Sequence, residues 1–228
     1  MAYTLNGTSD YWTGPAGISL AFPFSIGCFF KKSANNSPLV SVEVAGLTSR
    51  KYEIGCDSTA AFGAYCISAS LITTRKAVSS VAASTSSYDC IIGAWNGTAS
   101  RTIYHAGAVV TNTDSLTGSP GTCDVWVGVN PFNTAAGPFA GGDIAEIAIW
   151  NVDVGSSRAA SAQAGYSFQF IRPDALLYYW DLINGVVSKW NGLSLSVGGG
   201  SPTRIDHPRI YFPNRSQVLV DRKAALHL

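Results

Sequence analysis

The stretch Phe24-Ser-Ile-Gly-Cys-Phe-Phe30 has a period of two. Large apolar residues or cysteine occupy its even positions, and Ser25 and Gly27 lie between them. Successive side chains of a β-strand point to opposite faces of its sheet. The stretch therefore predicts a strand that places one face on a hydrophobic core.

The same alternation returns in four further segments, over residues 40–44, 52–56, 125–129 and 193–197. Turn-forming pairs such as Asn96-Gly97 and Gly141-Gly142 punctuate the chain. Many short alternating strands predict an all-β fold, an antiparallel jelly-roll sandwich of two sheets.

One short helix is expected late in the chain. Ser156 or Ser157 can cap it, residues 158–164 are rich in alanine, and Gly165 can end it. After it, Pro173 and Asp174 predict a single turn before a strand over 176–182.

Charge and hydropathy exclude two classes of partner. Lys and Arg number 15 and Asp and Glu 14, so the net charge is +1, which excludes bulk electrostatic binding of nucleic acid. The sequence has no run of about 18 apolar residues and no basic, apolar leader, so we expect no membrane span and no signal peptide. The five cysteines lack CxxC spacing and are expected to be buried free thiols of a protein made in a reducing cytosol: Cys28, Cys56, Cys66, Cys90 and Cys123.

Three motifs, in order, carry a family resemblance. Leu5-Asn-Gly-Thr-Ser-Asp-Tyr11 followed by Pro23-Phe-Ser-Ile-Gly-Cys-Phe29 resembles the opening of laminin-G-like, concanavalin-A-like jelly rolls. The stretch 90–107 resembles the central hairpin of that family, and 139–153 resembles its closing strand. The resemblance covers about residues 3–165 and implies the same sandwich.

The order of the segments is unusual for that family. A segment like 176–199 precedes the opening motif in many laminin-G-like domains, whereas here it follows everything else. The chain therefore resembles a circular permutation, which a sandwich tolerates when its ends lie close together. We expect residues 200–205 to lie beside Met1, a sandwich domain over 1–205, and an extension over 206–228.

The stretches 171–180 and 206–213 resemble laminin-G-like proteins encoded in tailed-bacteriophage genomes. This resemblance implies a structural virion protein, assembled in the host cytoplasm. The role it favours is a capsid decoration or cement protein that binds the head shell non-covalently. Its partners would be the major capsid protein and sister subunits, in a homo-oligomer on the virion.

The extension is basic and apolar. Together with the two residues before it, from Arg204 to Leu228, it carries five basic and two acidic residues, and Pro208 and Pro213 favour an extended course. We expect this arm either to close its own domain as an extra strand and loop, or to dock on another chain. The candidate interface residues are Arg204, Arg209, Tyr211, Phe212, Arg215, Arg222 and Lys223.

The sequence offers little for catalysis. Jelly-roll glycoside hydrolases need two carboxylates, and their strand motif Glu-x-Asp-x-x-Glu is missing, since Glu146 is followed two residues on by Ala148. The Gly-x-Ser-x-Gly elbow of serine hydrolases is missing as well. We expect no catalytic residue and no enzyme activity.

Metal binding is weakly indicated. Calcium is common in the resembled family, and Asp10, Asp143 and Asp153 are its candidate ligands here. The alternative, which we favour, makes these residues turn, cap and strand-opening residues. No zinc-ligand spacing occurs among the histidines and cysteines. We therefore expect no metal site and no cofactor, with calcium left open.

An alternative function is glycan binding, as a lectin-like module of a head or tail fibre that contacts host surface polysaccharide. Sugars bind to aromatic platforms, and Trp12, Trp95 and Trp126 are the candidates. Exposure of these side chains together at one rim would favour glycan binding. Burial of all three, with the C-terminal arm docked on another chain, would favour the capsid role.

Overall fold

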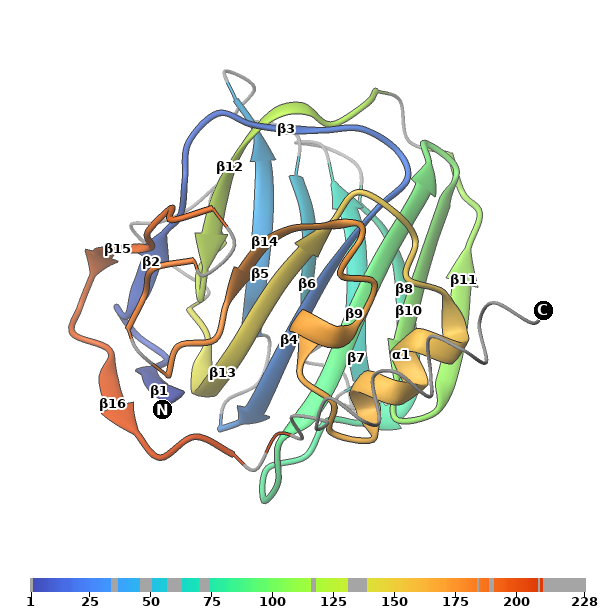
Figure 1. The fold of residues 1–228 in the computed structure, drawn as a ribbon. Coiled ribbons are helices and arrows are strands. Elements are labelled where there is room, and N and C mark those ends of the chain that lie inside the picture. The colour runs from blue at the N-terminus through green and yellow to red at the C-terminus, as the bar shows by residue number, and fades with distance from the viewer. Residues whose placement is uncertain are drawn as a thin grey trace.

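A computed structural model describes residues 2–33, 37–45, 51–56, 63–69, 74–115, 118–130, 139–183, 185–188, 191–208 and 210. Within them, two antiparallel sheets lie face to face, as Figure 1 shows. This confirms the predicted all-β sandwich.

The first sheet, sheet A, follows the spatial order β11-β10-β9-β4-β13-β1-β16, with β14 beside β13. Its strands are β1 (Ala2–Asn6), β4 (Phe24–Lys32), β9 (Asp89–Gly97), β10 (Ser100–His105), β11 (Ala108–Asn112), β13 (Gly141–Trp150), β14 (Leu176–Trp180) and β16 (Thr203–Ile205). Strand β13 pairs with β4 along one edge, and β1 and β14 share its other edge.

The second sheet, sheet B, follows the order β15-β2-β12-β5-β6-β7-β8, with β3 beside β12. Its strands are β2 (Tyr11–Thr13), β3 (Ile18–Leu20), β5 (Ser37–Val44), β6 (Lys51–Cys56), β7 (Gly63–Ala69), β8 (Thr74–Ala82), β12 (Gly121–Val127) and β15 (Ser196–Gly199). The strand predicted over 193–197 forms later, over 196–199, and the predicted alternation is wrong there: Leu195 is buried, but Leu193 and Val197 are exposed.

The main core fills the space between the sheets. At its centre the Phe24 ring stacks on Trp95, with 4.9 Å between centroids, and the edge of Tyr52 packs against both rings. The even positions of β4 point into this core, as the alternation predicts.

The outer face of sheet A is covered by a second apolar cluster. The helix α1 (Gly155–Gln163) lies in front of β9 and β10, and the short 3-10 helix η2 (Phe168–Phe170) lies over β4 and β13 (Figure 1). Gly27 makes room for η2, because a Cβ there would lie 3.0 Å from both Phe168 and Trp150. Neither described helix is long and apolar enough to cross a membrane.

Helix α1 begins earlier than predicted. The expected caps Ser156 and Ser157 lie inside the helix, and the Asp153 carboxylate accepts a hydrogen bond from the Gly155 N–H at 2.9 Å. A carboxylate three positions before Ser156, and one before the observed N-cap residue Val154, thus satisfies the first free N–H group. The helix ends as predicted, with Gly165 in the left-handed region at φ +95°.

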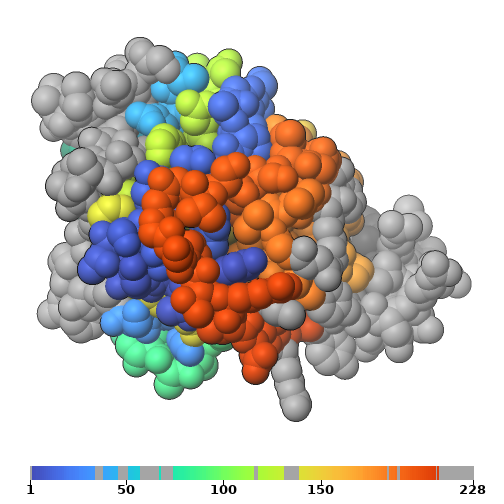
Figure 2. Space-filling view, turned by 90° about the vertical axis from the view of Figure 1, so that its left-hand side faces the viewer, coloured from blue at the N-terminus to red at the C-terminus, as the bar shows by residue number. Residues whose placement is uncertain are grey.

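The two ends of the sandwich meet as expected from the permuted order. Strand β16 pairs with β1, with Ala2 opposite Ile205 and Thr4 opposite Thr203. Figure 2 shows the red segment of β15 and β16 lying against the blue N-terminal segment. Beyond β16 the chain turns back onto sheet A, where Ile210 is 8% exposed within the second cluster.

Four of the five cysteines are buried free thiols, as expected: Cys28, Cys56, Cys90 and Cys123. The side chain of Cys66 lies outside the described residues. Burial raises the pKa of the Cys28 and Cys90 thiols well above the ordinary value, so both stay protonated and unreactive at neutral pH.

Candidate functional site

Two of the three predicted platform tryptophans are core residues. Trp12 is 1% exposed and contacts Tyr3, and Trp95 is 0% exposed under Phe24. Both occupy inward positions of their strands, on different sheets. Trp12 and Trp95 therefore cannot stack on a ligand, and the three predicted tryptophans do not meet at one rim.

Trp126 is placed differently. It holds an outward position of β12 and is half-buried on the outer face of sheet B. The half-buried rings of Tyr11 and Phe139 complete a row with it: the Tyr11 centroid lies 6.2 Å from Trp126 and 6.1 Å from Phe139. We call Tyr11, Trp126 and Phe139 the aromatic surface.

The position of Tyr11 depends on two glycines. Strand β15 runs beside β2, and Gly199 pairs with Tyr11. A Cβ on Gly198 would lie 2.1 Å from a Tyr11 ring carbon, and one on Gly199 2.5 Å from another. The phenol ring thus lies over backbone that carries no side chains, which holds it near Trp126.

A pair of carboxylates lies beside Trp126. Glu43 on β5 and Asp124 on β12 are opposite each other in the register, on the same outer face. Partial burial raises the pKa of Glu43, and repulsion by Asp124 raises it further, while Lys51 and the indole N–H of Trp126 act against this rise. One oxygen of Asp124 accepts a hydrogen bond from the Gly17 N–H at 2.9 Å. The pair offers further carboxylate oxygens as hydrogen-bond acceptors next to an aromatic ring.

A buried ion pair adjoins these acids. Lys51 Nζ lies 2.6 Å from Glu53 Oε2, and the Ser41 hydroxyl donates to the same oxygen at 2.7 Å. Lys51 also donates to the Asn130 side chain at 3.0 Å. Both charged residues are buried, so this lysine is committed to Glu53 and Asn130.

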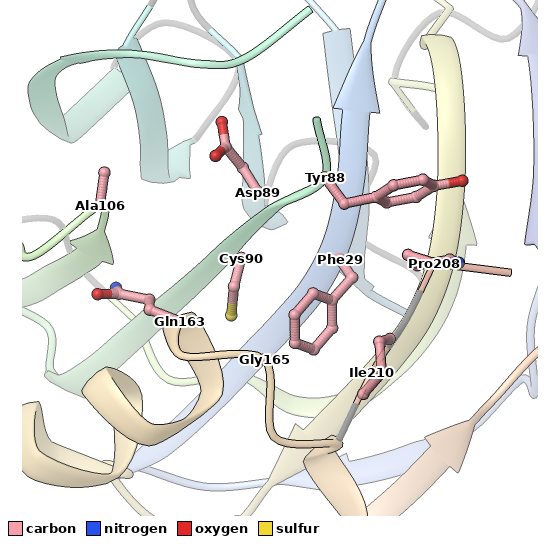
Figure 3. Close-up of a pocket in the computed structure, with 9 residues that line it drawn as sticks. All are labelled: Phe29, Tyr88, Asp89, Cys90, Ala106, Gln163, Gly165, Pro208 and Ile210. Carbon is pink, nitrogen blue, oxygen red and sulfur yellow. The ribbon is translucent and has the colours of Figure 1, made fainter. Parts of the chain in front are cut away.

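The outer face of sheet A holds a small cavity of about 130 Å³ between β4, β9, α1 and the chain after β16. Figure 3 shows Phe29 and Ile210 side by side along it, with Cys90 and Gln163 on the helix side. Most of its wall is apolar, and the Gln163 carbonyl is engaged by the Gly107 N–H at 2.9 Å. This cavity belongs to the packing of α1 and the arm on the sheet.

A serine on β8 of sheet B meets a histidine and an aspartate on β10 and β9 of sheet A. His105 Nδ1 lies 3.1 Å from Ser79 Oγ, and Nε2 lies 3.6 Å from Asp89 Oδ2. The set has the residue types of a hydrolase triad. However, Ser79 is 1% exposed and its oxygen accepts the Val81 N–H, so a substrate carbonyl cannot reach it.

The three candidate calcium ligands lie in separate places, each with protein donors. Asp10 accepts the N–H groups of Asn6 and Ser201. Asp143 accepts the Thr4 hydroxyl and pairs with Lys31, and Asp153 accepts hydrogen bonds from Asn96, Tyr104 and Gly155. These are turn, strand and cap roles. Across the described ranges, no three His, Cys, Asp or Glu side chains come together as a metal site.

Of the candidate interface residues, Arg204 lies in the described part of the chain. It is exposed on the edge strand β16 and donates to the Ile183 carbonyl at 3.0 Å. The others lie outside the described residues: Arg209, Tyr211, Phe212, Arg215, Arg222 and Lys223.

Sequence reasoning found Trp126 and missed its neighbours. Tyr11 and Phe139 are 128 positions apart and meet only through strand pairing. The one local signal was the alternation in Tyr11-Trp12-Thr13, which places Tyr11 on the face opposite Trp12.

Comparison with known proteins identifies structures of similar fold but no matching sequence family. No family model matches the sequence, and no curated protein matches it. Among solved structures, a heptameric SAP-like pentraxin from Limulus polyphemus matches with a TM-score of 0.64 and 8% identity, over 89% of this chain and 94% of the pentraxin chain. A putative carbohydrate binding protein from Bacteroides ovatus matches with a TM-score of 0.63 and 12% identity, over 93% of this chain and 61% of that one.

A third match is domain 4 of an extracellular arabinanase from Geobacillus stearothermophilus, solved in complex with arabinotriose. Its TM-score is 0.55 at 15% identity, over 71% of this chain and 76% of that domain. At these identities the likeness establishes a shared architecture. The chain thus has the jelly-roll sandwich architecture of these three solved structures.

Proposed function

We propose that this protein is a carbohydrate-binding module and that the aromatic surface on sheet B is its binding site. The observation that carries the proposal is the row of half-exposed rings, Tyr11, Trp126 and Phe139, beside the carboxylates of Glu43 and Asp124. The row lies on a sheet whose strand pairing fixes its geometry.

The chemistry of a sugar ring fits such a surface. One side of a pyranose carries C–H groups that pack on an aromatic face, and its edge carries hydroxyl groups that donate hydrogen bonds. Here the rings supply the apolar contact, and the oxygens of Glu43 and Asp124 accept the hydroxyls. Strands of sheet B hold Tyr11, Trp126, Glu43 and Asp124, and Phe139 is bridged to Val129 beside β12, so we expect little loss of order on binding.

The fold supports the same proposal. Two of the structural neighbours reported above are a putative carbohydrate binding protein and a domain in complex with arabinotriose. The capsid-decoration hypothesis stays a prediction. It rests on the resemblance of residues 171–180 and 206–213 to phage-encoded proteins, with the basic arm as the expected anchor. Co-sedimentation of the protein with particles that lack it would test it.

The experiment is a titration of the protein against a broad glycan array, followed by calorimetry on the strongest ligand. Trp126→Ala removes the largest ring of the aromatic surface and is expected to weaken binding at least about tenfold. Tyr178→Ala is the matched control, because Tyr178 is a half-buried aromatic residue on sheet A, stacked on Trp180. Equal loss in both variants, or no glycan binding by the parent protein, would contradict the proposal.

Gly198→Ala gives an independent probe. The new methyl group would collide with three carbon atoms of the Tyr11 ring and displace it, while Trp126 keeps its place. We expect weaker glycan binding with a folded-state stability close to that of the parent. Unchanged affinity would remove Tyr11 from the proposed site.

A further inference from the structure

We infer that the aromatic surface selects glycans that are neutral or carry amino groups, and rejects glycans that carry carboxylate or sulfate groups. This inference rests on the proposed function and names the ligand class for the same site. The observation behind it is the distribution of charge along two rows of side chains that cross the outer face of sheet B.

The strand register defines both rows. The first row contains Thr13, Trp126, Ser41, Glu53, Ile67 and Lys76. The second contains Asp124, Glu43, Lys51 and Thr74. A ligand on Trp126 therefore meets Asp124 and Glu43 as its nearest charged groups in the neighbouring row.

The cations of these two rows are not placed to receive an anion. Lys51 is buried against Glu53 and Asn130, and its attraction also reaches Glu43. Lys76 is exposed, but it lies four strands from Trp126, a distance of about 19 Å at the usual strand spacing. In these two rows, the charged residues next to Trp126 are therefore the acids Asp124 and Glu43.

This charge distribution discriminates among ligands. Glu43 and Asp124 face each other as like charges, an arrangement that is unfavourable in the free protein. Hydroxyl or ammonium groups of a ligand would donate to both carboxylates and relieve their repulsion. A ligand carboxylate or sulfate would add a third negative charge beside Glu43 and Asp124. It also has no hydrogen to donate to their oxygens.

The test begins with an array that holds neutral, amino-bearing, uronic, sialylated and sulfated glycans. The strongest neutral ligand is then compared with its own form oxidised at the primary hydroxyls to carboxylates, so that the pair differs in charge but not in backbone. We expect oxidation to weaken binding to the parent protein at least about tenfold.

The matched variant is Glu43→Gln with Asp124→Asn, which keeps the shape of the acids and removes their charge. Thermal unfolding confirms that the variant is folded. For it, we expect oxidation of the ligand to cost less than about threefold in affinity. An equal penalty in parent and variant would overturn the inference.

The two proposals fail in different ways. If the strongest ligands are anionic and their binding is lost in Trp126→Ala, the site stands and the inferred ligand class is wrong. If no glycan binds, or if Trp126→Ala leaves the affinity unchanged, the proposed function is wrong, and the inferred ligand class is then wrong as well.

Discussion

The two outer faces of this sandwich are used in opposite ways. On sheet A, apolar side chains such as Phe29 and Trp150 lie under α1, η2 and Ile210, and the face is closed. On sheet B, the aromatic surface and the acids beside it are half-exposed. One face is thus closed by apolar packing, while the other leaves polar and aromatic groups partly accessible at the surface.

Each face also buries a glutamate, by different means. Glu146 on sheet A is 0% exposed and accepts hydrogen bonds from neutral groups only: the Ser167 hydroxyl, the Phe168 N–H and the Tyr179 hydroxyl. Glu53 on sheet B is 2% exposed and has Lys51 as its partner. The buried carboxylate of Glu146 is thus stabilised by neutral hydrogen-bond donors. That of Glu53 is stabilised by the positive charge of Lys51.

The largest effect is expected from breaking the ion pair of sheet B. Lys51→Met leaves the Glu53 carboxylate buried without its cation, which costs about 4 kcal/mol of unfolding free energy. Urea unfolding at neutral pH measures this loss. The double change Lys51→Met with Glu53→Met removes both charges and should recover most of it. A loss below about 1 kcal/mol in the single variant would show a pair screened by water.

The next effect concerns the cover of sheet A. Ile210→Ala removes a buried side chain from the cluster around Phe29 and should cost about 3 kcal/mol. Shortening the chain after Ile205 should cost at least as much. Val197→Ala is the control, because this apolar residue is 59% exposed and its truncation should be nearly neutral. Equal stability of the parent and Ile210→Ala would mean that the arm contributes nothing to the domain.

The smallest expected effect is a pH dependence of the unfolding free energy that comes from Glu146. Burial raises the pKa of Glu146 to about 7, against an ordinary value of 4.5. The folded state therefore keeps this proton where the unfolded chain has lost it, so unfolding free energy falls as pH rises from about 4.5 to 7 and is level above.

Glu146→Gln resembles the protonated acid at every pH and should remove that dependence. We expect the parent to lose on the order of 2 kcal/mol more than the variant between pH 5 and pH 8. Parallel stability curves for the two proteins would contradict the assignment of this titration to Glu146.

The sequence predicted the sandwich because its local patterns agree with the fold. Alternation in residues 24–30 identified a strand, and the permuted order of motifs placed residues 200–205 beside the N-terminus. Alternation fails where both faces of a strand are covered. Residues 90–95 have no polar position to alternate with, so nothing local indicates that the Trp95 ring points inward.

The site was harder to predict for the same reason. Trp126 is identifiable, but the row it belongs to depends on register: β15 must present Gly198 beneath Tyr11, and Phe139 must arrive beside β12. Register is set by turns and by the whole core. The opposition of Glu43 and Asp124 likewise exists only once β5 and β12 pair.

The pairing of β1 has a consequence for how the chain is made. Both neighbours of β1 come late, since β13 begins at Gly141 and β16 at Thr203. At ribosomal rates of about 5–20 residues per second, the first strand waits roughly 7–30 seconds for its earlier partner. During that time both of its hydrogen-bonding edges are open to other nascent chains. Faster synthesis or a chaperone that shields this strand should therefore raise the yield of folded protein.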